Sequence, residues 1–129
     1  MRDESPSEEM VREMGKNFAR RWRTAERARE REIAQRHAAA MAQIERLVHA
    51  FQVEDPQLRS VILFGSLAHG TPHNPRFDID LAVDSDKYWE LLGIALDQPI
   101  PVDLVDLPRT SPHLRTRILA EGRALYDVG

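Results

Sequence analysis

The amino-acid sequence predicts an α+β fold of mixed α/β character. We expect a small mixed sheet of about four strands, flanked by helices and preceded by a long N-terminal helical extension. Two observations support this prediction. No proline occurs between Pro6 and Pro56, and apolar residues recur there at three- or four-residue spacing. Beyond Pro56, short apolar runs alternate with helical patterns, and 129 residues leave room for one hydrophobic core.

The helical segment is predicted to begin near Ser5, because Ser5 can cap a helix, Pro6 suits its first turn and Glu8 completes a capping box. Two apolar stripes follow, separated by the charged residues 26–32. The first consists of Val11, Met14, Phe18, Trp22 and Ala25, and the second of Ile33, His37, Met41, Ile44, Val48 and Phe51. One long helix and two shorter helices both fit this pattern. We expect residues 1–32 to form a helical extension and residues 33–129 to form the main domain.

The remaining elements are predicted from short apolar runs, turn residues and caps. Strands are expected at 58–64, 77–83, 99–105 and 123–126, and helices at 87–96, where Asp86 can cap, and from 111 to 122. Residues 65–70 form a turn with at most one helical turn, and 71–76 form a loop. The result is one sheet of four strands with helices packed against it.

The composition and charge exclude several kinds of protein. Cysteine is absent, so disulfides, thiolate nucleophiles and Cys-based zinc sites are excluded. No run approaches a membrane span and no apolar leader begins the sequence, so a cytoplasmic protein is expected. The net charge is −3. Residues 20–31 contain six arginines and two glutamates, a pattern more typical of a solvated, salt-bridged helix face than of an RNA contact.

Three carboxylates are the strongest functional signal. Asp78 and Asp80 alternate with Ile79 in a predicted strand, so both carboxylates lie on one face, ~6.6 Å apart along the backbone. Such a pair is unfavourable unless a cation lies between the two groups, and Mg²⁺ with oxygen ligands suits that role. Asp103, in a neighbouring predicted strand, can join them. Asp106 is expected on the opposite face or beyond the strand end.

The turn at Gly65 and Ser66 complements these acids. A strand that ends in Gly-Ser and leads into a short helical turn presents backbone N–H groups and a hydroxyl, which can bind phosphate. A phosphate site beside an aspartate pair and a third acid indicates phosphoryl or nucleotidyl transfer. A Gly-Ser pair or an Asp-Ile-Asp triplet alone would be a weak signal. The order of strand, Gly-Ser, loop, Asp-x-Asp strand, helix and Asp strand is what favours this chemistry.

Residues 58–128 resemble the minimal nucleotidyltransferases of the polymerase-beta-like nucleotidyltransferase superfamily. LFGSLAHGTPHNPRFDIDLAVD and VDLVDL match the family's Gly-Ser turn, Asp-x-Asp strand and later aspartate. The resemblance implies a nucleotidyltransferase fold in which Gly65 and Ser66 contact a triphosphate and Asp78, Asp80 and Asp103 are catalytic and hold Mg²⁺. His69 occupies a phosphate-binding position where relatives commonly have arginine. Two other departures are Phe77, in place of a small serine, and a loop before Asp78 that is one residue longer than usual.

The resemblance also implies a biological setting. Many minimal nucleotidyltransferases are antitoxins that pair with an HEPN-type RNase toxin, and some transfer AMP from ATP to a toxin tyrosine. We therefore expect an ATP- and Mg²⁺-dependent protein adenylyltransferase of a toxin–antitoxin system. One alternative is a weak or inactive binding module that masks a toxin or scaffolds an oligomer, and another is nucleotidyl transfer to RNA ends. The N-terminal helix is expected to contact a second copy or a partner protein.

Overall fold

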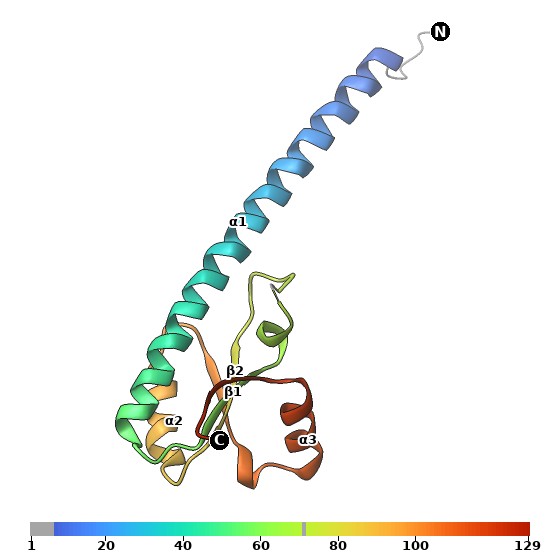
Figure 1. Ribbon diagram of the computed structural model, residues 1–129. Helices are drawn as coiled ribbons and strands as arrows, with labels where there is room; N and C mark the ends of the chain where they lie inside the picture. Colours follow the sequence, from blue (N-terminus) through green and yellow to red (C-terminus); the bar gives the residue numbers. More distant parts are fainter. Residues whose placement is uncertain (1–6, 71) are drawn as a thin grey trace. The chain divides into compact units, whose positions relative to one another are not determined.

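The computed structural model describes residues 7–70 and 72–129 (Figure 1). The chain divides into two compact units, Met1–Glu32 and Ile33–Gly129. The predicted fold class is confirmed, because the second unit contains a four-stranded mixed sheet with helices on both faces. The assignment of residues 1–32 to a helical extension and of residues 33–129 to the main domain stays a prediction.

One continuous helix, α1, runs from Glu8 to Glu54, which resolves the choice between one helix and two. Ser7 caps its N-terminal end, since the Ser7 hydroxyl accepts a 3.1 Å hydrogen bond from the Met10 N–H. The predicted cap at Ser5 and first-turn position of Pro6 lie outside the described residues. The helix ends two residues before Pro56, as expected for a residue that cannot continue a helix.

The sheet has the strand order β3-β2-β1-β4. Its strands are β1 (Ser60–Phe64), β2 (Ile79–Asp84), β3 (Val102–Asp106) and β4 (Arg123–Asp127). β1 pairs antiparallel with β2 and β4, whereas β2 and β3 are parallel and are joined through helix α2 (Tyr88–Leu96). The parallel pair brings both aspartate-bearing strands together in the same direction.

Helices cover both faces of this sheet (Figure 1). The larger core lies between the sheet, residues 33–54 of α1 and α2, and the smaller core lies under α3 (Pro112–Glu121). The first includes Ala40, Ile44, Leu47, Phe51, Ile79, Leu81 and Leu91, and the second Ile62, Ala82, Leu107 and Ile118. Side chains alternate along β2, so Ile79 and Leu81 point into the larger core while Asp80 points to the side of α3.

Several predicted boundaries and one cap differ from the structure. Asp86 does not cap α2; the Ser85 hydroxyl accepts the Lys87 N–H at 2.9 Å, and Asp86 instead accepts a hydrogen bond from Arg59 at 3.1 Å. β3 begins at Val102 rather than at residue 99, because Pro99 and Pro101 lack the N–H that a strand ladder needs. Across residues 7–70 and 72–129, no helix is long and apolar enough to cross a membrane.

Candidate active site

The strand register brings two of the three predicted carboxylates together. Asp80 of β2 and Asp103 of β3 are direct partners in the parallel pair. Asp78 precedes the first residue of β2 and is exposed, so the ladder does not hold its side chain as it holds that of Asp80. Asp106, the last residue of β3, lies three positions from Asp103 and therefore on the other face, as predicted, where it accepts a 3.0 Å hydrogen bond from Arg109.

Two polar side chains of α1 hold the starts of these strands. Arg36 donates hydrogen bonds of 3.2 and 2.6 Å to the Phe77 carbonyl oxygen, and its guanidinium lies 5.1 Å from the centre of the Phe77 ring. The buried Gln43 side chain donates to the Ile100 carbonyl at 2.8 Å and accepts from the Ile100 N–H at 3.0 Å. Phe77 directly precedes Asp78, and Ile100 lies three residues before Asp103. Both carboxylate-bearing segments are thus anchored to one helix.

Gly65 packs directly against the Asp80 carboxylate. Its φ of +74° belongs to the left-handed region that favours glycine. A β-carbon at this position would overlap Oδ2 of Asp80, so only a residue without a side chain permits this approach. The turn then continues as the 3₁₀ helix η1 (Ser66–His69), with the Ala68 N–H bonded to the Gly65 carbonyl at 3.2 Å. The Gly-Ser turn and the aspartate pair therefore form one local structure.

Negative charge accumulates at Asp80. Burial raises the pKa of Asp80 to about 6, and the neighbouring carboxylates of Asp103 and then Asp78 add to the rise. Burial disfavours the charged form of the side chain, and like charges disfavour it further. A cation bound beside Asp80 would remove both penalties, so the electrostatics of this strand pair favour a cation ligand.

The residues present fit Mg²⁺ in the chemistry of their donor atoms. Asp78, Asp80 and Asp103 offer hard carboxylate oxygens, which Mg²⁺ prefers, and they concentrate negative charge at Asp80. Within the described ranges, however, no three Asp, Glu, His or Cys side chains are gathered at the spacing of a metal centre. The assignment of Mg²⁺ to these three aspartates stays a prediction.

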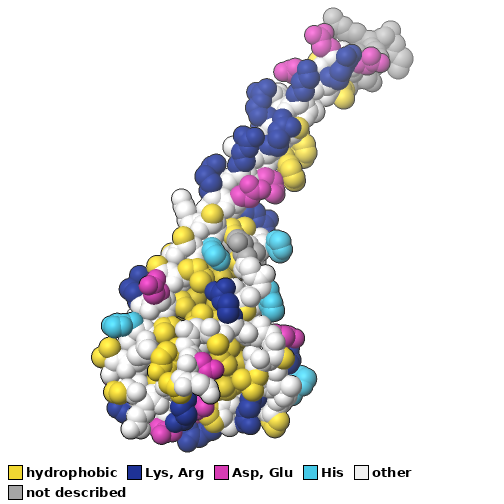
Figure 2. Space-filling model, viewed as in Figure 1, with side chains coloured by type: hydrophobic (Ala, Val, Ile, Leu, Met, Phe, Trp, Pro, Cys, Tyr) yellow, Lys and Arg dark blue, Asp and Glu magenta, His cyan; other side chains and the backbone are white. Residues whose placement is uncertain are grey.

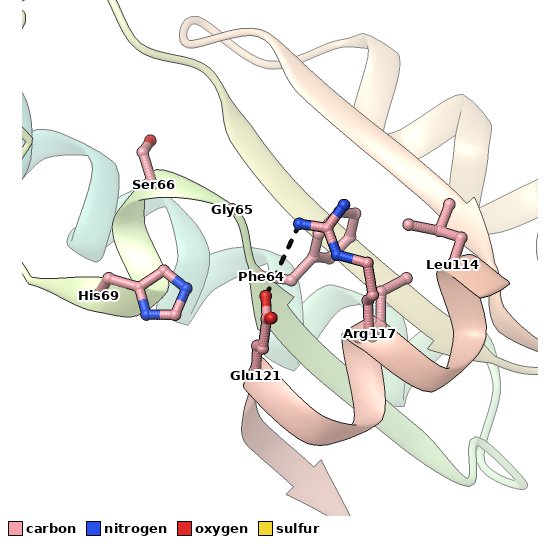
Figure 3. Close-up of a pocket in the computed structure, with 8 residues that line it drawn as sticks. Phe64, Gly65, Ser66, His69, Leu114, Arg117 and Glu121 are labelled. Atoms are coloured by element: carbon pink, nitrogen blue, oxygen red, sulfur yellow. Dashed lines mark ion pairs between the residues drawn. The ribbon is translucent and has the colours of Figure 1, made fainter.

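A cavity of about 370 Å³ lies beside the Gly-Ser turn. It is lined on one side by Gly65, Ser66 and His69 and on the other by Arg117 and Glu121 of α3 (Figure 3). Arg117 and Glu121 form an exposed ion pair of 3.8 Å along the helix, and His69 lies across the cavity from them. The Ser66 hydroxyl points away from this pair in the close-up. The cavity offers space for part of a ligand whose phosphates reach the turn.

Three further residues, Arg36, Gln43 and Arg117, contribute to the site and are not among the residues predicted from the sequence. Gln43 lies between apolar positions of the second stripe, and a glutamine there signals a buried polar contact. Arg36 and Arg117 have no comparable signal, because isolated arginines on helices are usually solvated. His69 is exposed and lies on the cavity wall beside Ser66, which brings it to the predicted phosphate-binding turn.

Comparison with known proteins supports the resemblance drawn from the sequence. The family profile described as "Polymerase beta, Nucleotidyltransferase" matches residues 45–128, which is more than half of the chain. No curated protein matches the sequence significantly.

Three solved structures resemble this chain and are described as toxin–antitoxin complexes. One, a toxin–antitoxin with AMP-PNP, is 32% identical, with 65% of this chain and 73% of that chain covered and a TM-score of 0.53. A tyrosine-to-alanine mutant of the toxin–antitoxin MntA-HpeT is 32% identical, with 68% and 72% covered and a TM-score of 0.51. A mutant of MntA-HpeT with two aspartate-to-glutamate changes is 26% identical, with 67% and 72% covered and a TM-score of 0.51.

Proposed function

Because this chain belongs to the polymerase beta nucleotidyltransferase family, we propose that it is an antitoxin that transfers AMP from ATP to its partner toxin. The observation on which this proposal rests most is the contact between Gly65 and the Asp80 carboxylate, with Asp103 in register beside Asp80. That contact joins the phosphate-binding turn to the acidic strands. The similar toxin–antitoxin complexes support a toxin as partner, and the sequence resemblance suggests that it is of the HEPN type. The expected cytoplasmic location stays a prediction.

The residues of this chain have distinct roles in the proposed reaction. Backbone N–H groups and the Ser66 hydroxyl of the Gly-Ser turn bind the triphosphate, and the His69 imidazole and the Arg117 guanidinium line the two sides of the cavity. Asp78, Asp80 and Asp103 would hold Mg²⁺, which when bound neutralises phosphate charge.

Transfer is an in-line displacement at the α-phosphorus of ATP. The oxygen of an acceptor hydroxyl on the toxin, expected to be a tyrosine, forms a bond to the α-phosphorus. The bond from that phosphorus to the oxygen bridging the β-phosphate breaks, and pyrophosphate leaves with the electron pair. Asp103 is exposed at this site and accepts the hydroxyl proton. The protein accelerates such a reaction mainly by positioning the reactants and by stabilising charge.

The test uses the full chain, its cognate toxin and ATP labelled on the α-phosphate. We expect Mg²⁺-dependent transfer of label to the toxin, with a mass increase of one AMP by intact-protein mass spectrometry. Asp80→Asn and Asp103→Asn should abolish labelling. Asp97→Asn is the matched control, because Asp97 is an exposed aspartate at the end of α2, outside both strands, and should label normally.

A binding module without catalysis is the second candidate function. It is favoured by the lack of a three-ligand metal cluster among the residues that the structure describes and by the exposed His69 at the phosphate-binding turn. Thermal unfolding with and without Mg²⁺-ATP separates the two, since a ligand of the folded state raises Tm. If the toxin stays unlabelled and the Tm of the wild-type and Asp80→Asn chains responds identically to Mg²⁺-ATP, the proposed enzyme is contradicted and the binding module is supported.

A further inference from the structure

The first part of α1 has an exposed apolar stripe on one face. Its members are Val11, Met14, Phe18, Trp22 and Ala25, and the two aromatic side chains are 71% and 58% exposed. Figure 2 shows hydrophobic side chains along one edge of this segment and Lys and Arg along the other. The four steps from Val11 to Ala25 sum to fourteen positions, a mean spacing of 3.5 residues, which is typical of a coiled-coil seam. Such a seam is stable when a second helix covers it.

The spacing of this stripe is symmetric about Phe18. The steps are three, four, four and three residues, so the pattern is the same in both chain directions. In an antiparallel pair with the two Phe18 residues opposite each other, Met14 faces Trp22 of the second copy. Val11 in the same way faces Ala25 of the second copy. Larger residues thereby oppose smaller ones at each layer beyond the centre, and both copies use the same surface, as a two-fold interface requires.

The charges of this segment distinguish antiparallel from parallel pairing. Residues 8–14 contain three glutamates and one arginine, a net charge of −2, whereas residues 22–29 contain three arginines and one glutamate, a net of +2. Antiparallel pairing places the acidic end of each copy beside the basic end of the other, whereas parallel pairing places like charges together. Residues 15–21, with a net of +3, oppose themselves in both arrangements and weaken both.

From the symmetric stripe and the opposite end charges, we propose that residues 8–29 form an antiparallel helix pair with a second copy of this chain, centred on Phe18. This proposal does not depend on nucleotidyl transfer. A seam of about two turns on each side of its centre is short, and isolated helix pairs of this length are marginal. The pair is therefore expected to be reversible and to depend on protein concentration. A mass that increases with concentration in sedimentation equilibrium would support it.

The absence of cysteine allows a direct test of direction and register. In the full chain, Phe18→Cys should give a disulfide-linked dimer in oxidised glutathione, because only residue 18 faces itself. Val11→Cys should not cross-link alone, but should cross-link when mixed with Ala25→Cys. A paired seam raises the effective thiol concentration to the millimolar range, so cross-linking should exceed that of the control by at least about tenfold. The control is Trp89→Cys in α2, where Trp89 is 74% exposed.

Three outcomes would overturn the proposal. Equal self-cross-linking of Val11→Cys and Phe18→Cys would indicate a parallel pair. Cross-linking no greater than that of Trp89→Cys, with a wild-type mass that stays monomeric at all concentrations, would exclude a second copy. If the stripe residues became protected from solvent only after the partner toxin was added, this face would be assigned to the toxin. Phe18→Glu, which leaves the Ile33–Gly129 unit untouched, should shift the chain to the monomer while its circular dichroism stays helical.

Discussion

The apolar stripes in the two parts of helix α1 differ in how far their side chains are exposed. In residues 33–54, Ile44, Leu47 and Phe51 are at most 3% exposed, whereas Phe18 and Trp22 in residues 8–32 are more than half exposed. Both stripes have helical spacing, and the more exposed one contains the larger aromatic residue. Periodicity therefore identifies the apolar face of a helix, but it does not say which surface covers that face.

The polar residues of the helix differ in the same way. Arg36 and Gln43 donate hydrogen bonds to backbone carbonyls of the sheet unit. In residues 8–32, the Thr24 hydroxyl donates to the Arg20 carbonyl at 2.9 Å and Glu8 forms a 3.8 Å ion pair with Arg12, and both contacts are local to the helix. Such exposed local contacts contribute little to the free energy of unfolding, at most ~1 kcal/mol each. The C-terminal part is thus integrated in the fold, and the N-terminal part is available for association.

The largest expected effect comes from one chemical change made in both parts. Phe51→Ala removes a fully buried ring and should lower the free energy of unfolding by about 3–5 kcal/mol. Phe18→Ala removes an exposed ring and should change the same quantity by less than about 0.5 kcal/mol in dilute protein. Urea unfolding followed by circular dichroism measures both. Similar losses in the two variants would contradict the contrast between the two parts.

The second comparison uses two glycines. Gly65→Ala places a β-carbon against Asp80 at a φ of +74°. This change should lower the free energy of unfolding by about 1–3 kcal/mol and weaken ATP binding. Gly15 lies inside α1 with nothing within 4 Å of an added β-carbon, so Gly15→Ala should stabilise the helix by about 0.5–1 kcal/mol. Thermal unfolding should therefore shift in opposite directions. If the Gly65→Ala chain had normal stability and bound ATP normally, the proposed role of Gly65 in this site would be contradicted.

The smallest expected effect concerns a single charge and its dependence on pH. The pKa of Asp80 is raised to about 6 by burial and by Asp103 and Asp78, so the folded chain retains a proton that the unfolded chain loses near its ordinary pKa of 3.8. Stability from this group is therefore lost as the pH rises from about 4 to about 6. At neutral pH, Asp80→Asn should stabilise the metal-free chain by roughly 1–2 kcal/mol after allowance for solvent screening.

At about pH 4 the same substitution should be nearly neutral, because Asp80 is then protonated in the fold. Glu13→Gln, a change of an exposed carboxylate in residues 8–32, should alter stability by less than about 0.5 kcal/mol at either pH and is the matched control. Chemical denaturation at the two pH values measures both variants. A stabilisation by Asp80→Asn that does not vary with pH would indicate a packing effect instead of a charge effect.

Much of the architecture could be predicted from local patterns. The four strands, the turn at Gly65 and the pairing of Asp80 with Asp103 follow from alternation, turn residues and the parallel connection through a helix. Helix caps were less accessible, because they depend on side-chain geometry: Asp86, which was expected to cap α2, accepts a hydrogen bond from Arg59 instead, and Lys87 stands at the cap position without a side-chain cap bond. The sequence signals a buried polar contact at Gln43 but not its partner, Ile100. The contact of Arg36 with Phe77 and the place of Arg117 on the cavity wall could not be predicted, since they depend on residues more than forty positions away or on the packing of α3.

The bonds of Arg36 and Gln43 have a mechanical consequence. The two residues are seven positions apart in α1, which corresponds to ~10.5 Å along a helix axis. One is bonded to the residue before Asp78 and the other to the residue three places before Asp103. Helix α1 therefore helps to fix the distance between the two acidic strands at their N-terminal ends. A force that bends or shortens this stretch of α1 would act first on Asp78, which lies outside the strand ladder, because the pairing of β2 with β3 holds Asp80 and Asp103 together.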